Sequence, residues 1–497
     1  MSNLRDSKVA RWTALVFLAF AMFCAYIFMD ILSPVKSILE TTRDWDSTAF
    51  GFYAGSETFL NVFIFFLIFA GIILDKMGVR FTALLSGAVM LLGAAINWYS
   101  VTEMFFGTGL EAWFNHNLNY IPGFDELGVS PFYRGMPASA KCASVGFMIF
   151  GCGVEMAGIT VSRGIVKWFR GKEMALAMGS EMALARLGVA SCMILSPLIA
   201  KANILGGANV SHSVAFGLLL LIIAFIMFIA YFFMDKRLDA QTGEAEEKDD
   251  PFKVSDIRKI LSSSGFWLVA LLCVLYYSAI FPFQKYAVNM LQCNLGFTET
   301  QAGTVFAVFP LLAAAITPFL GNFIDRKGKA ASMLILGSVF LIVCHLTFAF
   351  ILPMFRPAVS ETGEILGAAS KGGVVLALTT ILILGASFSL VPASLWPSVP
   401  KLVDRKVIGS AYALIFWIQN IGLWLFPVLI GKILTSRNQD IIQSTVIKDE
   451  YKPVLYNYTW PLVMLACLGG AALILGFVLK IVDKKQKLGL ELPNIKA

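Results

Sequence analysis

Long apolar runs dominate this sequence, and they constrain its fold more than any other feature. A helix needs about 20 mostly apolar residues to cross the hydrocarbon core of a bilayer. Backbone polar groups must be paired inside lipid, so each run that crosses is expected to be a helix. The twelve runs lie near residues 12–34, 48–74, 80–100, 143–168, 174–200, 213–234, 265–290, 299–324, 330–353, 373–397, 407–433 and 459–482. The sequence therefore predicts an all-α membrane protein with twelve transmembrane helices.

The composition agrees with a chain surrounded by lipid. Of its 497 residues, 58% are hydrophobic and only 14% are charged, whereas a soluble domain carries roughly 25% charged residues. The net charge of +7 therefore concerns membrane topology and does not indicate nucleic-acid binding.

Basic residues fall in alternate connections, which indicates one orientation in the membrane. Because such residues stay on the cytoplasmic side, both termini are expected inside the cell. We expect a monomer in the plasma membrane, a bacterial inner membrane. The basic residues are Arg5, Lys8, Arg11, Lys76, Arg80, Lys167, Arg170, Lys172, Arg326, Lys327, Lys329, Lys401, Arg405, Lys406, Lys480, Lys484, Lys485 and Lys487.

The pattern of potential ligands and nucleophiles argues against an enzyme. The eight cysteines are scattered without a CxxC spacing, and the three histidines lie far apart. Neither pattern is typical of a metal site. No nucleophile–base pair emerges either, so we expect no cofactor and no catalysis.

A charged segment divides the predicted helices into six and six. Residues 236–262 form a polar cytoplasmic linker between an N-terminal bundle, 1–235, and a C-terminal bundle, 263–497. The longest outward segment, about 101–141, is expected to be either a small cap or a mobile loop.

The two halves share a ten-residue pattern, GIILDKMGVR at 71–80 and GNFIDRKGKA at 321–330. Internal repeats of this kind are found in secondary transporters. The glycines allow close approach and sharp turns, and the aspartate can cap a helix or pair with a base. Alternatively, the loops act only as charged topology signals. The repeated residues are Gly71, Asp75 and Gly78, followed by Arg80, and Gly321, Asp325 and Gly328.

This doubled G-x-x-x-D-[RK]-x-G pattern resembles the signature loop of the major facilitator superfamily. The resemblance implies two six-helix bundles around a central cavity, with alternating access by rocking. Trp396-Pro397, at the predicted inner end of the tenth helix, is then a plausible gate position.

Charged residues inside the predicted helices are costly and usually face a cavity or a partner. Glu155 lies sixteen residues before Gly171, and Arg186 lies fifteen after it. At 1.5 Å per residue, both stand roughly 23 Å from the turn, near the midplane. Either they form a structural salt bridge, or they bind a ligand. Arg186 suits a carboxylate, and Glu155 suits an ammonium group or a proton.

Three further acidic residues are candidate proton sites. Asp30 and Glu57 lie nearer the outer ends, where they either line a hydrated vestibule or serve function. Glu181 lies five residues from Arg186, so it is expected to point about 140° away and to pair with another helix.

The second half offers polar and aromatic candidates at similar depth. Tyr276 and Tyr277 lie in the seventh predicted helix, and Gln419 and Asn420 lie in the eleventh. They either bind substrate with Glu155 and Arg186 or only pack and hydrogen-bond between helices.

Three stretches suggest a narrower branch of the superfamily. KWFRGKEMALAMGSEMALARLG at 167–188, SLWPSVPKLV from Ser394 and GSAYALIFWIQNIGL at 409–423 resemble lysosomal dipeptide uniporters and their bacterial relatives. The resemblance implies that Glu155 and Arg186 hold the peptide termini. We therefore expect a dipeptide transporter, either a uniporter or a symporter. The alternatives are a proton-coupled carrier of small organic anions and a non-transporting membrane receptor.

Overall fold

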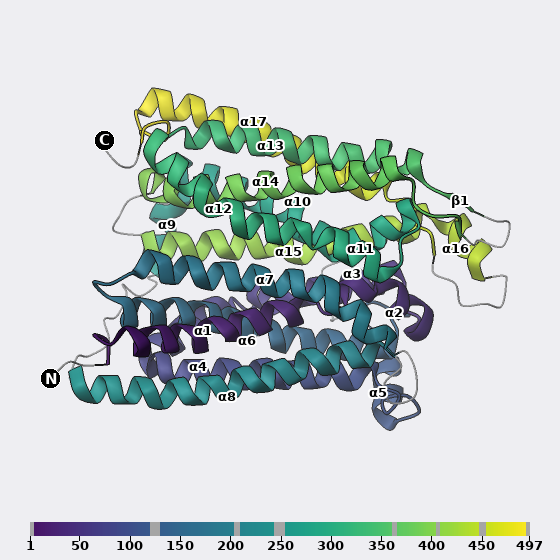
Figure 1. The fold of residues 1–497 in the computed structure, drawn as a ribbon, viewed down its shortest axis with the longest axis horizontal. Coiled ribbons are helices and arrows are strands. Elements are labelled where there is room, and N and C mark those ends of the chain that lie inside the picture. The colour runs from purple at the N-terminus through teal and green to yellow at the C-terminus, as the bar shows by residue number, and fades with distance from the viewer. Residues whose placement is uncertain are drawn as a thin grey trace. The chain divides into compact units, whose positions relative to one another are not determined.

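Helices make up nearly all of the computed structural model (Figure 1). The structure describes residues 4–119, 130–202, 209–242, 254–359, 365–403, 408–446 and 454–493. In the first part of the chain the helices are α1 (Lys8–Met29), η1 (Ser33–Val35), α2 (Lys36–Arg43), α3 (Ser47–Phe63), α4 (Phe66–Val101), α5 (Gly109–His116), α6 (Ala138–Phe169), α7 (Met174–Lys201) and α8 (Val210–Thr242).

The remaining elements follow the predicted linker. They are α9 (Val254–Leu261), α10 (Ser264–Leu295), α11 (Glu299–Phe306), α12 (Val308–Lys327), α13 (Ala330–Leu346), η2 (Thr347–Ile351), η3 (Leu352–Phe355), β1 (Ala358–Val359), β2 (Ile365–Leu366), α14 (Lys371–Leu402), α15 (Ile408–Arg437), α16 (Gln439–Val446) and α17 (Thr459–Gln486). The two short strands pair antiparallel, with Ala358 opposite Leu366.

Eleven helical segments of the described chain are long and apolar enough to cross a membrane. The second and third predicted crossings share α4, which continues from Phe66 across a kink at Gly78. The first part of the second crossing is the separate helix α3, of 17 residues. The prediction of an all-α, multi-pass membrane protein is confirmed, and twelve crossing helices are consistent with the structure.

The predicted helices over 48–74 and 80–100 are divided where expected, because α4 joins two helices across a kink at Gly78. The second predicted helix also contains a break that we did not expect, at Ile64–Phe65. Phe65 has a φ of 56°, in the left-handed region, which interrupts the helix there. From Phe66 the chain stays helical through the first repeated loop except at Gly78, whose φ of 77° and ψ of 166° kink α4.

Backbone contacts group the chain into two units, which differ from the predicted halves in two stretches. The first unit comprises 1–31, 56–192 and 199–251. The second comprises 32–55, 193–198 and 252–497. The division at the linker stays a prediction, since residues 243–253 lie outside the described chain.

In the first unit, α4 packs along α6 and α8, and α1 packs against α6 and α8. Glycines bring α4 and α6 into backbone contact. A Cβ on Gly93 would lie 2.4 Å from the nitrogen of Phe150, and one on Gly146 would lie 2.7 Å from the Gly93 oxygen. Both distances are too short for any side chain.

The described parts of the segment 101–141 pack onto this unit. The ammonium of Lys141 donates to the carbonyl oxygens of Phe114 and Asn117 and to the side chain of Asn119. Phe105 and Phe114 are buried beside Cys142. These contacts favour a packed cap for residues up to 119, whereas residues 120–129 lie outside the described chain.

In the second unit, α13 packs against α14 and α17, and α10 packs against α15 and α17. The core between α10 and α13 is partly polar. The imidazole of His345 is fully buried and lies 3.0 Å from the Ala279 carbonyl oxygen. Such pairing satisfies polar groups that cannot reach water.

Candidate substrate site and gates

Four of the predicted intramembrane charged residues lie near enough to one tyrosine of the first unit to act on it electrostatically. The charges of Glu57 on α3, Glu155 on α6, and Glu181 and Arg186 on α7 all act on Tyr26 of α1. All five side chains are half-buried. We call these five residues the Tyr26 cluster. It contains a guanidinium for an anionic group and three carboxylates for a cationic group.

Glycines set the helix spacing around the Tyr26 cluster. A Cβ on Gly151 of α6 would lie 1.9 Å from the Glu57 carbonyl oxygen. One on Gly188 of α7 would lie 2.4 Å from the Phe23 carbonyl oxygen. Close backbone contact therefore brings α3 to α6 and α1 to α7. At Gly158 the nearest atom to such a Cβ is 4.0 Å away, so this position leaves space beside Glu155.

Two other acidic residues were predicted as proton or vestibule sites, Glu181 and Asp30. Glu181 and Arg186 both act electrostatically on Tyr26, and the expectation that Glu181 points away from Arg186 stays a prediction. Asp30 follows α1 as its C-cap and is only 1% exposed. This burial does not fit a hydrated vestibule.

Sequence reasoning missed Tyr26. The available signal was the polar hydroxyl within the apolar stretch FCAYIFMD, four residues before Asp30. Residues four apart share a helix face. That face can be found only when the neighbours of α1 are known.

The two adjacent tyrosines of α10 have different environments. Tyr276 is fully buried, and its hydroxyl hydrogen-bonds to the Leu334 carbonyl and to the Ser338 hydroxyl of α13. This geometry gives Tyr276 a packing role, so we leave it out of the proposed substrate site. Tyr277 is half-buried and accepts a hydrogen bond of 3.1 Å from the indole of Trp396.

Trp396 belongs to an aromatic cluster of the second unit. Its ring lies 5.0 Å from that of Phe416, and the ring of Tyr277 stacks on Phe281 at 5.5 Å. Gln419 accepts a bond from the Cys273 thiol at 3.2 Å, and Asn420 is buried. Substrate contacts of Tyr277, Gln419 and Asn420 stay predictions.

Ion pairs hold the first repeated loop within its unit. Asp75 accepts a bond of 2.6 Å from Arg163 of α6. Arg80 lies 3.2 Å from Asp239 and 3.9 Å from the buried Asp235, both on α8. The aspartate was expected either to cap a helix or to pair with a base, and in this loop Asp75 pairs with a base. Sequence reasoning did not identify Asp235 or Asp239, the two carboxylates that pair with Arg80.

The repeated glycines behave alike in both loops. Gly78 and Gly328 have φ values of 77° and 73°, which L-residues with a side chain rarely adopt. By contrast, no atom lies within 4 Å of a Cβ placed on Gly71 or Gly321. The sharp turn explains Gly78 and Gly328, whereas close approach explains neither Gly71 nor Gly321.

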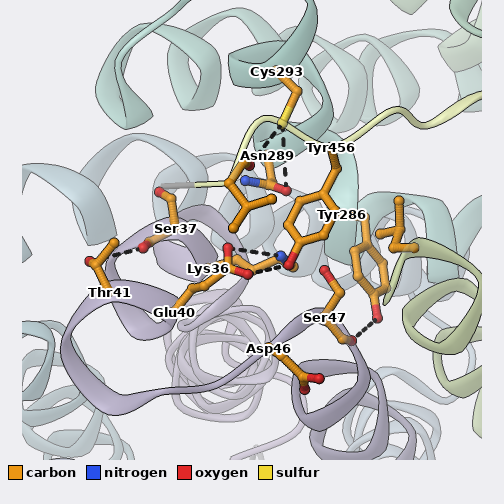
Figure 2. Close-up of polar contacts among 12 residues, drawn as sticks. Lys36, Ser37, Glu40, Thr41, Asp46, Ser47, Tyr286, Asn289, Cys293 and Tyr456 are labelled. Atoms are coloured by element: carbon orange, nitrogen blue, oxygen red, sulfur yellow. Dashed lines mark hydrogen bonds and ion pairs between the residues drawn. The ribbon is translucent and has the colours of Figure 1, made fainter. Parts of the chain in front are cut away.

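A second polar group lies around α2 in the second unit (Figure 2). The Tyr456 hydroxyl donates to the Glu40 carboxylate. The Lys36 ammonium is fully buried, 3.8 Å from the other Glu40 oxygen and 4.6 Å from the centre of the Tyr456 ring. The Ser37 hydroxyl donates to Glu299 at 2.9 Å. We call these five residues the α2 cluster.

The start of α3 is packed as tightly in the same unit. A Cβ on Gly51 would lie 2.5 Å from the Pro427 carbonyl oxygen, and one on Gly431 would lie 2.2 Å from that of Ser47. The Tyr286 hydroxyl donates to the Pro427 oxygen at 3.0 Å. The α2–α3 segment is therefore joined to α10 and α15 by backbone-close contacts.

Comparison with known proteins identifies the class. The sequence of residues 133–427 matches the family described as the Major Facilitator Superfamily. This match covers more than half of the chain, and the chain belongs to that superfamily of membrane transporters.

The chain is also similar to named members. It is 25% identical over 436 residues to the lysosomal dipeptide transporter MFSD1 of Danio rerio, covering 86% of this chain and 81% of that protein. It is 27% identical over 298 residues to the Homo sapiens protein of that name, covering 59% of each.

Two solved structures share the fold. A D-xylose-proton symporter has a TM-score of 0.62 at 12% identity and covers 94% of this chain and 97% of its own. A bacterial homolog of the human lysosomal transporter Spinster has the same score and identity and covers 96% and 98%. At this identity the likeness concerns the fold alone.

Proposed function

We propose that this transporter carries short peptides across a membrane by alternating access. Arg186 binds the C-terminal carboxylate of the peptide, and Glu155 binds its N-terminal ammonium. The Tyr26 cluster is the observation that carries this proposal, because it gathers both kinds of charge around one hydroxyl. The names of the similar proteins in Danio rerio and Homo sapiens support the same substrate class.

The chemistry of the Tyr26 cluster suits a zwitterion. A guanidinium binds a carboxylate through two parallel hydrogen bonds, and a carboxylate accepts bonds from an ammonium. A dipeptide presents these two groups at opposite ends of a short backbone, so one solute can satisfy both sides of the cluster.

The gates follow from the repeated loops and the α2 cluster. Helix packing in transporters switches between discrete arrangements. The ion pairs of Asp75 and Arg80 are proposed to hold the cytoplasmic side, where both termini lie. The α2 cluster is proposed to close the opposite side. Trp396 and its aromatic neighbours are proposed to line the path.

The test is uptake of labelled dialanine into proteoliposomes. Wild-type protein is expected to take up the peptide, whereas Arg186→Ala and Glu155→Gln lower uptake at least tenfold, because each removes a charged partner of the solute. Lys485→Ala, an exposed charge on α17, serves as the control. Unchanged uptake in both cluster variants would remove the proposed site.

One observation favours a second candidate, a proton-coupled carrier of small organic anions. The Tyr26 cluster holds three carboxylates for one guanidinium, so Glu57 or Glu181 is available to carry a proton. This candidate predicts accumulation of monocarboxylates under an inward proton gradient, with no competition from dialanine. Competition by dialanine and none by monocarboxylates would support the peptide proposal instead.

A further inference from the structure

The segment after α17 is seated on the second repeated loop. The backbone N–H of Lys329 donates to the Glu491 carbonyl at 3.1 Å, and that of Ala330 donates to the Leu490 carbonyl at 3.1 Å. A Cβ on Gly328 would lie 2.4 Å from the Glu491 oxygen. The absence of a side chain at Gly328 therefore makes room for this segment as well as for the turn.

The carboxylate of Glu491 caps α13. One oxygen accepts from the backbone N–H of Ser332 at 2.8 Å, and the other accepts from its hydroxyl at 2.8 Å. The residue that precedes α13, Lys329, makes no side-chain cap of its own. A negative charge at a helix N-terminus also interacts favourably with the helix dipole. Glu491 thus supplies from the far end of the sequence the cap that the loop lacks.

Side chains of α14 and α17 fix the segment in place. The buried Asp483 accepts from the backbone N–H groups of Leu490 and Glu491, at 2.9 and 3.3 Å. Lys401 of α14 donates to the Gly489 carbonyl at 2.9 Å. The Lys480 ammonium donates to the Ser332 hydroxyl at 2.7 Å. We call Gly489–Leu492 the C-terminal strap.

The internal repeat shows which side chain takes the corresponding place in the first loop. In the first loop Arg80 reaches Asp235 and Asp239 of α8. The residue 250 positions later is Ala330, which has no charge to offer. In the second half the buried aspartate of the last helix, Asp483, binds the strap instead, and the strap binds the N–H of Ala330.

We infer that the C-terminal strap positions the second repeated loop and takes the role that Arg80 has in the first loop, where the matching residue of the second loop is Ala330. Glu491 is the positioning residue, because its backbone and both carboxylate oxygens contact the loop and the start of α13. Only the effect of the strap on the transport cycle rests on the proposed function.

Hydrogen exchange of the purified full-length protein tests the strap without any solute. Glu491→Ala removes the cap, so the amides of 329–332 are expected to exchange roughly tenfold faster. Glu491→Gln keeps an acceptor and loses the charge, so a smaller increase is expected. Leu492→Ala is the control, because this side chain of the strap is 64% exposed. A change in 329–332 alone distinguishes local release from unfolding.

A second-site variant tests the replacement itself. Adding Ala330→Arg to Glu491→Ala introduces a basic side chain at the position that matches Arg80, and exchange at 329–332 is expected to slow again. Because Ala330 is only 5% exposed, thermal unfolding of the double variant checks that it still folds. In uptake assays Glu491→Ala lowers the maximal rate and leaves KM unchanged. Equal exchange in wild type and Glu491→Ala would overturn the strap, and an unrescued double variant would overturn its equivalence to Arg80. If the exchange pattern were as expected but the protein took up no dialanine, the strap would stand and only the proposal of peptide transport would be contradicted.

Discussion

At the scale of single residues, the Tyr26 cluster combines one guanidinium and three carboxylates that act on a single tyrosine. Counting helical rise from Gly171 put Glu155 and Arg186 at one depth, and the structure brings the charges of both to Tyr26. The count carries no information about which face of α1 meets α7. For that reason Tyr26 was not found.

Removing the Tyr26 hydroxyl tests its part in binding. Tyr26→Phe keeps the ring and deletes a hydrogen-bonding group among four charges, so KM for dialanine uptake is expected to rise roughly tenfold. The maximal rate and thermal stability stay near wild type. Tyr99→Phe is the matched control, because Tyr99 is also a half-buried tyrosine of the first unit and its ring packs against Phe105. An unchanged KM would show that Tyr26 only packs.

At the scale of helices, hydropathy located the crossing segments but not every end. The stretch FIFFLIF at 63–69 is continuously apolar, so nothing in its composition marks the break at Phe65. The break depends on one left-handed residue, whose conformation tertiary packing selects. Glycine spacing was more informative, since Gly78 and Gly328 both adopt the expected sharp turn.

The repeated glycines allow an internally controlled stability test. Gly78→Ala forces a side chain into a left-handed conformation and is expected to cost about 1–2 kcal/mol. Gly71→Ala, in open space on the same helix, is expected to change stability by under about 1 kcal/mol, and in the stabilising direction. Thermal unfolding in detergent measures both.

The second loop provides an independent repetition of this test. Gly328→Ala, which also meets the strap at 2.4 Å, is expected to destabilise the protein more than Gly321→Ala. If the alanine variants of Gly78 and Gly71 melted at the same temperature, the turn geometry would not be what keeps a glycine at 78.

At the scale of the whole molecule, the six-plus-six repeat predicted the family and its fold. The α2 cluster and the C-terminal strap could not be predicted, because each joins residues far apart in the sequence. Tyr456 and Glu40 are 416 positions apart, and Ser332 and Glu491 are 159 apart. Neither contact leaves a periodic signal along the chain.

The proposed alternating access requires the α2 cluster to open, and a buried thiol can report this opening. Cys293 is 2% exposed and its thiol contacts the Val454 carbonyl oxygen beside Tyr456. In a Cys467→Ser background, which removes the exposed cysteine, Tyr456→Phe is expected to speed maleimide labelling of Cys293 roughly tenfold, because a bond to a charged acceptor is lost. Tyr99→Phe should not. Equal labelling would remove the α2 cluster from the gate.

The most direct test of the central claim is equilibrium binding of dialanine, N-acetyl-dialanine and dialanine amide to the purified protein. Wild type is expected to bind only the free dipeptide tightly, with both blocked analogues at least roughly thirtyfold weaker, because each leaves one charge of the site unpaired. Arg186→Ala should bind the amide as well as the free peptide, and Glu155→Gln should do the same for the acetylated one. If both variants kept the wild-type discrimination, Glu155 and Arg186 would not be the residues that hold the peptide termini.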